Sequence, residues 1–177
     1  MTNNKKEKKI GQVFTPKYLV ENMLDYIGYI GSNILKKHII DNSCGAGAFL
    51  TEIVRRYCTV AIFNSISKEE IKKHLETYIH GIELEDVAYA NCINNLNAIV
   101  EDFDITNVNW DVIHEDALSV TKHDGKMNFV VGNPPYVRVH NLNDSYDKVK
   151  NFAFANGGMT DLYLVFYELG LRMLAKS

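Results

Sequence analysis

Asn133, Pro134, Pro135 and Tyr136 follow directly after the apolar segment 128–132, which ends in a glycine. Two consecutive prolines fix two φ angles and remove two backbone donors, so this turn is stiff and presents bare carbonyl oxygens. An amide side chain stands on one side of the prolines and an aromatic ring on the other. These residue types in this order predict a binding site for a planar molecule that carries an amino group.

Three further groups that could do chemistry follow expected strands. The segment Asp-Asn-Ser-Cys-Gly-Ala-Gly (41–47) follows the first strand, and its Gly45 and Gly47 allow close approach of a ligand to the backbone. Glu83 ends the second strand, where a carboxylate can accept hydrogen bonds from a ribose diol. Asp116 follows the third and could accept from an adenine amino group. Each signal is weak alone, but three consecutive strand ends together predict an adenosine site.

The chain alternates expected helices and strands, and these elements must position the residues named above. Helices are expected over 16–29, 48–57, 67–76, 86–98 and 161–175, and strands over 38–41, 78–84, 110–114 and 127–131. Thr15 is the expected N-cap of the first helix, and Ser67 opens a capping box. This alternation predicts an α/β fold with a parallel, doubly wound sheet that binds ligands at the carboxyl ends of its strands.

Composition favours one globular domain. The chain has 177 residues, 46% of them hydrophobic and 23% charged, and no apolar run approaches the ~20 residues of a membrane span. A net charge of −3 does not suggest a nucleic-acid binder, and the basic run at 5–9 is expected to belong to a flexible tail over 1–10.

Cys44, Cys58 and Cys92 have no spacing typical of a zinc site or a disulfide framework. With no apolar signal region at the start, the composition predicts a cytoplasmic protein with free thiols.

The motifs together resemble one family. The Asn-Pro-Pro-Tyr turn after a fourth strand is similar to that of amino-methyltransferases that use S-adenosylmethionine. "GQVFTPKYLVENML" (11–24) resembles the N-terminal motif of DNA adenine-N6 methyltransferases of restriction–modification systems. "TDLYLVFYELGLRML" (160–174) resembles the helix after their active-site loop, with Asp161 and Tyr163 near the pocket. The resemblance implies a Rossmann-like sheet of the class I methyltransferases.

The resemblance also assigns roles to single residues. It implies that S-adenosylmethionine is held by Phe14, Thr15 and Pro16 at its tail, by Asp41, Gly45 and Gly47 around its methionine and ribose, by Glu83 at the ribose hydroxyls, and by Asp116 at the adenine amino group. Asn133 and the Pro134 carbonyl would then bind the amino group of the target adenine. Tyr136 would stack on the flipped base, and Pro135 would also bind this substrate base. Arg138 is a candidate phosphate contact. This chemistry needs no metal.

The chain departs from the family pattern at two points. Asn42 stands where the family commonly has a proline, with an expected effect on the rigidity of the loop alone. The chain also stops at Ser177, where the family continues into a fifth strand, a hairpin and a target-recognition domain. Residues 11–177 are therefore expected to be the N-terminal part of a catalytic domain, truncated after the fourth strand and its following helix. The implied partners are double-stranded DNA and a missing C-terminal part or a specificity subunit.

Two alternatives remain open from the sequence. The same turn occurs in enzymes that methylate a glutamine amide of release factors and in some RNA methyltransferases, because all face the same planar nitrogen. The Phe-Thr-Pro segment favours DNA among these substrates. The second alternative is a non-catalytic fragment that only binds the cofactor.

Overall fold

A four-stranded parallel sheet forms the centre of the protein; its strands are short, and the two inner strands are fully buried. The computed structural model describes residues 15–136, 149, 152–155 and 161–176. The strand order is β3-β2-β1-β4. The strands are β1 (Ile39–Asp41), β2 (Ile79–Glu83), β3 (Asp111–His114) and β4 (Phe129–Val131). Phe14, Arg138 and the expected tail over 1–10 lie outside the described residues.

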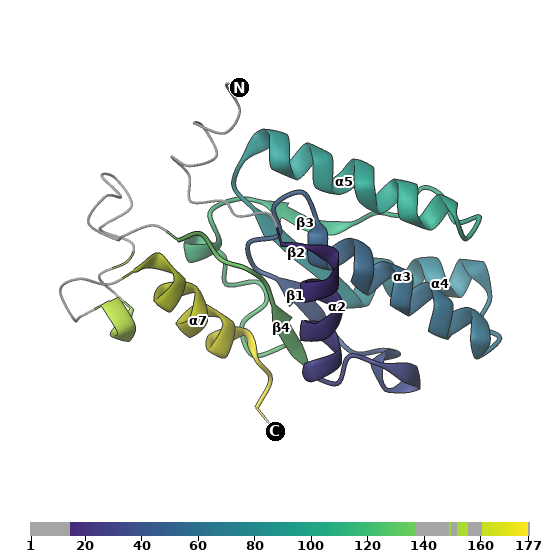
Figure 1. The fold of residues 1–177 in the computed structure, drawn as a ribbon, viewed down its shortest axis with the longest axis horizontal. Coiled ribbons are helices and arrows are strands. Elements are labelled where there is room, and N and C mark those ends of the chain that lie inside the picture. Colours follow the sequence, from purple (N-terminus) through teal and green to yellow (C-terminus); the bar gives the residue numbers. More distant parts are fainter. Residues whose placement is uncertain (1–14, 137–148, 150–151, 156–160, 177) are drawn as a thin grey trace.

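Helices cover both faces of this sheet, as Figure 1 shows. They are α2 (Lys17–Tyr26), α3 (Ala48–Phe63), α4 (Lys68–Tyr78), α5 (Asp86–Glu101) and α7 (Leu162–Met173). Ile39 packs into one hydrophobic core with the first four helices, whereas the next residue, Ile40, packs into a second core with α7. Successive strand residues point to opposite faces, so apolar side chains at both positions require cover on both sides. The doubly wound arrangement expected from the sequence is confirmed.

Element boundaries differ from the expected ones where tertiary contacts decide them. Helix α3 continues six residues beyond the expected end at 57 and stops at Phe63, because Cys58 and Ala61 are fully buried in the core. At the start of α2 the expected cap is wrong: Pro16 is the N-cap residue, and the Thr15 side chain does not cap the helix. The expected cap at Ser67 is confirmed, since its side chain accepts a hydrogen bond from the Glu70 N–H at 3.2 Å.

The order of the strands reverses at β1, which lies between β2 and β4. Ile39 pairs with Ile79 on one side and with Phe129 on the other, and Asp41 lies beside Val131 at the carboxyl end. The loop after β1 and the turn after β4 therefore leave the sheet side by side. Ligands of open α/β sheets bind at such a point.

The outer side of β4 is partly covered by the residues that follow α7. Leu174 forms a parallel bridge with Met127, and the Ala175 N–H donates to the Met127 carbonyl at 2.8 Å. Among the described residues, no helix has the length and apolar character needed to cross a membrane.

Candidate functional site

The loop after β1 is held against the end of β2 by hydrogen bonds from its backbone. The Cys44 N–H donates to the Ile82 carbonyl at 2.9 Å, and the Gly45 N–H donates to Glu83 Oε2 at 2.7 Å. Gly45 and Gly47 have φ angles of 55° and 87°, which L side chains rarely adopt. A Cβ atom at Gly45 would meet nothing within 4 Å, so this side of the loop is open to a ligand.

Glu83 joins the loops that follow β1 and β2. Besides Gly45, it accepts the N–H of Glu85 through Oε1 at 2.8 Å, and the residue is 7% exposed. Each carboxylate oxygen carries two lone pairs, so both oxygens keep the capacity to accept a further hydrogen bond. The side chain is thus fixed by backbone groups and can still bind a hydroxyl donor.

Asp41 is a buried carboxyl group at the carboxyl end of β1. Its Oδ1 accepts the Ser43 N–H at 3.1 Å. Burial raises the pKa of Asp41 to about 7, the nearby charge of Glu83 adds to this rise, and the hydrogen bond from Ser43 opposes it. A cationic ligand at this edge would favour the ionised form of Asp41.

Gly132 brings the turn after β4 against Asp41. Its φ angle is 155°, and a Cβ atom there would lie 2.7 Å from Asp41 Oδ1, so a larger residue would clash. This contact places the Asn-Pro-Pro-Tyr turn directly beside the loop after β1. From the sequence, Gly132 was expected only as the end of a strand, although a glycine between a strand and two prolines is a signal for a close approach.

Asn133 is oriented by Thr15, which lies 118 positions earlier in the sequence. Its Nδ2 atom donates to Thr15 Oγ1 at 3.1 Å, and Thr15 is buried. Because the two polar atoms of an amide diverge from the same carbon, this bond fixes the direction of the Asn133 side-chain oxygen as well. Sequence reasoning assigned Thr15 to the cofactor and to a helix cap, and it missed this contact.

Tyr136 and Tyr163 place two aromatic rings at the outer side of the turn. Their centroids are 6.2 Å apart with an angle of 42° between the rings, and the residues are 60% and 39% exposed. Tyr163 lies in the first turn of α7, which begins after Asp161. The structure therefore brings Tyr163 next to the turn, where the sequence analysis expected it.

Asp116 follows β3 at the same edge of the sheet. It caps the short 3-10 helix η2 (Ala117–Ser119), and its Oδ1 accepts the Leu118 N–H at 3.0 Å.

Asn42, the departure from the family pattern, is buried with its Nδ2 atom 3.5 Å from the Phe166 carbonyl of α7. The Asn42 side chain can thus donate a hydrogen bond to α7 on the opposite face of the sheet. A proline has no side-chain donor and could not make this bond.

The carboxyl ends of β1, β2 and β3 each carry or precede one acidic side chain, namely Asp41, Glu83 and Asp116. An edge with three carboxyl groups and a glycine loop open on one side fits a cationic ligand that offers hydroxyl and amino donors. S-Adenosylmethionine has these groups: a sulfonium, an ammonium, a ribose diol and an adenine amino group. The residues present therefore fit the cofactor expected from the sequence.

Comparison with known proteins agrees with this geometry. The family model described as N-6 DNA Methylase matches residues 1–169. The type II methyltransferase M.BstVI of Geobacillus stearothermophilus is 31% identical over 178 aligned residues, which cover 94% of this chain and 32% of that protein. The chain thus spans about a third of the length of this curated relative.

Two solved structures share the fold. The methyltransferase subunit of a type I restriction–modification system from Streptococcus thermophilus has a TM-score of 0.61 at 18% identity, over 93% of this chain and 32% of that chain. A structure from Listeria monocytogenes described as a class I S-adenosylmethionine-dependent methyltransferase has a TM-score of 0.63 at 15% identity, over 91% of this chain and 43% of that chain. The described residues thus have the Rossmann-like fold of class I methyltransferases.

Proposed function

The chain belongs to the N-6 DNA methylase family, and from this premise we propose that it provides the cofactor site and the target-base turn of a restriction–modification methyltransferase. The proposed reaction moves a methyl group from S-adenosylmethionine to N6 of adenine in double-stranded DNA. The observation that carries the proposal is the hydrogen bond between Thr15 and Asn133, together with the contact of Gly132 on Asp41. These contacts hold an amide acceptor beside a loop that fits the cofactor.

Most of the residues proposed to hold the cofactor lie at or just after the carboxyl ends of three strands. Glu83 would accept from the ribose hydroxyls and Asp116 from the adenine amino group. Asp41, Gly45 and Gly47 would surround the methionine and ribose, and Phe14, Thr15 and Pro16 would close over the tail. When bound, S-adenosylmethionine supplies an electrophilic methyl group on a sulfonium.

Asn133 and Pro134 address the weak nucleophilicity of the adenine amino group. The nitrogen lone pair is delocalised into the ring, which keeps the group planar. The Asn133 side-chain oxygen and the Pro134 carbonyl can accept its two hydrogens and favour a more tetrahedral nitrogen. Thr15 fixes the amide in advance, so the rate enhancement comes from positioning and electrostatics.

Tyr136 and Tyr163 support the proposal for a base turned out of the duplex. Their exposed rings, 6.2 Å apart, offer aromatic faces beside the turn. Pro135 is proposed as a further contact to this base. Arg138 is proposed as a phosphate contact on its position two residues after Tyr136.

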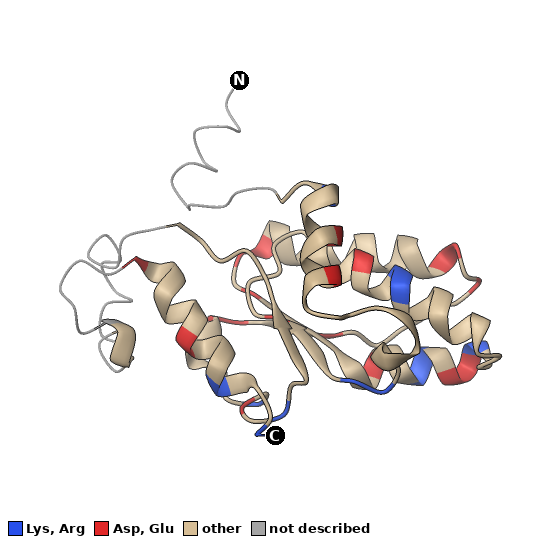
Figure 2. Ribbon diagram, turned by 60° about the horizontal axis from the view of Figure 1, so that its bottom comes forward, with Lys and Arg blue, Asp and Glu red and all other residues tan. Residues whose placement is uncertain are grey.

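The charge distribution indicates that other protein surface helps to bind DNA. The chain has a net charge of −3, and Figure 2 shows the lysines and arginines of the described residues scattered over several elements. We therefore propose that the complete enzyme uses a further part of the chain or a specificity subunit, with residues 11–177 as the N-terminal part of its catalytic domain. The proposed location is the cytoplasm.

Transfer of labelled methyl groups tests the function. In the complete protein, tritium from labelled S-adenosylmethionine should appear at adenine N6 of duplex DNA. Asn133→Ala should abolish transfer and leave cofactor affinity nearly unchanged, because this side chain is proposed to bind only the base. Asn94→Ala, which alters an exposed asparagine of α5, is the matched control and should remain active. Label in RNA or in a release-factor glutamine, with none in DNA, would overturn the proposed substrate.

The cofactor role is tested separately by calorimetry. Glu83→Gln keeps the size of the side chain but removes its charge. Loss of a charge-assisted hydrogen bond typically costs ~1.5–3 kcal/mol, so affinity for S-adenosylmethionine should fall by roughly tenfold or more. Unchanged affinity in this variant would refute the role of Glu83 even if DNA is methylated.

A further inference from the structure

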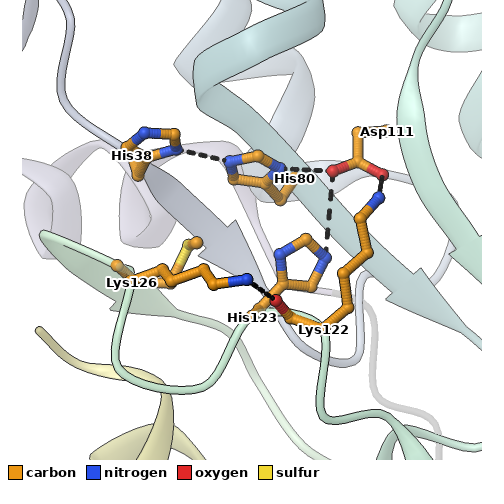
Figure 3. A pocket seen from close by; sticks show the side chains of 7 residues that line it. His38, His80, Asp111, Lys122, His123 and Lys126 are labelled. Atoms are coloured by element: carbon orange, nitrogen blue, oxygen red, sulfur yellow. Dashed lines mark hydrogen bonds and ion pairs between the residues drawn. The ribbon is translucent and has the colours of Figure 1, made fainter.

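The edge of the sheet opposite the proposed cofactor site carries a cluster of histidines. His38 immediately precedes β1, His80 is the second residue of β2, and Asp111 is the first residue of β3. His80 and Asp111 are direct partners in the pairing of β2 with β3. Because the strands are parallel, these residues gather near the amino ends, whereas Glu83 lies at the other end of β2. With His123 they line a pocket of about 360 Å³ (Figure 3).

The cluster forms a chain of close polar contacts. His38 Nδ1 lies 2.9 Å from His80 Nε2, and His80 Nδ1 lies 2.7 Å from Asp111 Oδ2. His80 is buried, and the Asp111 side chain is 19% exposed. The orientation of the His80 ring is therefore set from both sides, by His38 just before β1 and by Asp111 at the start of β3.

His123 points a second imidazole at the same carboxylate without completing a hydrogen bond. Its Nε2 atom is 3.9 Å from Asp111 Oδ2, and its ring centroid is 4.8 Å from that of His80. His123 is only 2% exposed, and its Nε2 has no hydrogen-bond partner among the described residues. A buried ring nitrogen without a partner is energetically costly, so a ligand that binds this nitrogen would remove the cost.

We propose that His80, Asp111 and His123 form a binding site for a divalent transition-metal ion such as Zn²⁺. The ligand atoms that these three side chains offer lie within 4.8 Å of one another. Two imidazoles and one carboxylate are ligands that zinc accepts, and three protein ligands leave a position for water. This inference is independent of the proposed methyl transfer, and the cysteine spacing considered in the sequence gave no sign of it.

The distances allow coordination with small movements. Zinc–nitrogen and zinc–oxygen bonds of about 2.0–2.2 Å place tetrahedral ligand atoms roughly 3.3 Å apart. The observed separations of 2.7 Å and 3.9 Å from Asp111 Oδ2 fall on either side of this value. An ion between the three groups would replace the direct contact of His80 with Asp111 and draw His123 inward.

His38 supplies the hydrogen-bond partner that a metal-binding histidine commonly has at its other ring nitrogen. Without metal, His38 Nδ1–H can donate to His80 Nε2, and His80 Nδ1–H can donate to Asp111. With metal on His80 Nδ1, the direction reverses: His80 Nε2–H donates to His38 Nδ1, and His38 carries its proton on Nε2. The number of protons on the two rings is the same in both states, and such a partner orients the ligand ring.

Lys122 competes with the ion for Asp111 and provides a test. Lys122 Nζ lies 2.5 Å from Asp111 Oδ1, whereas Lys126 Nζ donates to the Lys122 carbonyl. The Lys122 side chain is 58% exposed, so it can turn into solvent when an ion binds Oδ2.

Calorimetry with zinc chloride and absorption spectroscopy with cobalt(II) test the site. The wild-type chain should bind one ion, with cobalt bands typical of nitrogen and oxygen ligands and no sulfur-to-cobalt charge transfer. His123→Gln should weaken binding at least tenfold. Lys122→Ala should strengthen binding several-fold, because it removes the cation that competes for Asp111. His114→Gln, which alters an exposed histidine at the other end of β3, is the matched control and should bind as the wild type does.

Thermal unfolding distinguishes a variant that has lost the metal site from a variant that no longer folds. Zinc should raise the midpoint of the wild type and of Lys122→Ala, and it should raise that of His123→Gln much less. Circular dichroism of each metal-free variant should match the wild type. Equal affinity of wild type and His123→Gln, or binding no tighter than to free imidazole, would overturn the proposal and leave the cluster as a hydrogen-bonded network. A thiolate cobalt spectrum would also overturn it by placing the ion at the cysteines.

Discussion

A single buried carboxyl group, that of Asp41, makes the stability of the protein depend on pH. Its pKa is raised from 3.8 to about 7, so the folded chain holds a proton that the unfolded chain releases near pH 4. The contribution to stability is therefore complete below pH 4 and is lost as the pH rises to about 7. This group alone should lower the free energy of unfolding by up to about 1.4 kcal/mol per pH unit in that window.

Urea unfolding between pH 4 and pH 8 measures this effect. Asp41→Asn keeps an oxygen that can accept from Ser43 but cannot ionise, so its stability should decline less over the window than that of the wild type. Subtracting one curve from the other removes the contributions of histidines common to both proteins. Parallel curves would mean that Asp41 ionises normally in the folded state.

The Thr15 hydroxyl is expected to act on catalysis through Asn133. Thr15→Val keeps the shape of the side chain but removes the acceptor for Asn133 Nδ2. Loss of one hydrogen bond of ~1–1.5 kcal/mol should lower the single-turnover methylation rate of the complete enzyme by roughly tenfold. Thr15→Ser, which keeps the hydroxyl, should restore most of the rate. If cofactor affinity falls and the rate at saturation does not, Thr15 acts on the cofactor alone.

At the scale of residues, the sequence predicted the identity of the polar groups better than their contacts. Glu83 and Asp116 were assigned from their positions after strands, and both lie at the expected edge of the sheet. The bond between Thr15 and Asn133 joins residues 118 positions apart, so no local pattern contains it. The proposed metal site was missed for the same reason, because two strands and a distant turn each supply one of its residues.

At the scale of elements, the turn from β1 into α3 depends on two glycines with different surroundings. Gly47 has a φ angle of 87°, and a Cβ atom there would lie 2.9 Å from the Cys92 sulfur of α5. Gly47→Ala should therefore combine backbone strain with a clash and destabilise by roughly 2–4 kcal/mol. Gly45→Ala adds strain in open space and should cost about 1 kcal/mol. Chemical denaturation of the two variants tests this difference, and equal losses would contradict the role of the α3–α5 contact.

The types and order of the helices and strands could be predicted from sequence, whereas their ends could not. Short apolar strands bounded by glycine and acidic residues left little ambiguity in the alternation. Helix α3 extends to Phe63 because Cys58 and Ala61 pack in the core, a tertiary effect that the local pattern does not include. Pro16 takes the cap position of α2, and the Thr15 side chain accepts a hydrogen bond from Asn133 instead of capping the helix.

At the scale of the whole molecule, the core protects all three thiols. Cys44, Cys58 and Cys92 are free and buried. The hydrogen bond with Cys92 and burial raise the pKa of Cys44, and burial raises the pKa of Cys58 to about 12. A thiol that does not ionise is a poor nucleophile.

The folded chain should therefore react slowly with Ellman's reagent at pH 8, and denaturation should release three reactive thiols. Time courses with and without guanidinium chloride measure this. Rapid reaction of one thiol in the folded chain would show that the layer between α3 and α5 opens readily.

The position of β1 in the sheet has a consequence for how the protein folds. Ile39 pairs with Ile79, 40 positions away, and with Phe129, 90 positions away. Closing the longer loop costs about 0.7 kcal/mol more in chain entropy, so the β1–β2–β3 unit should assemble before β4 docks. Until then β1 is an open edge, which is a point of vulnerability to association during refolding. Pulsed hydrogen exchange should show protection of the β2 amides before those of β4, and refolding yield should fall as protein concentration rises.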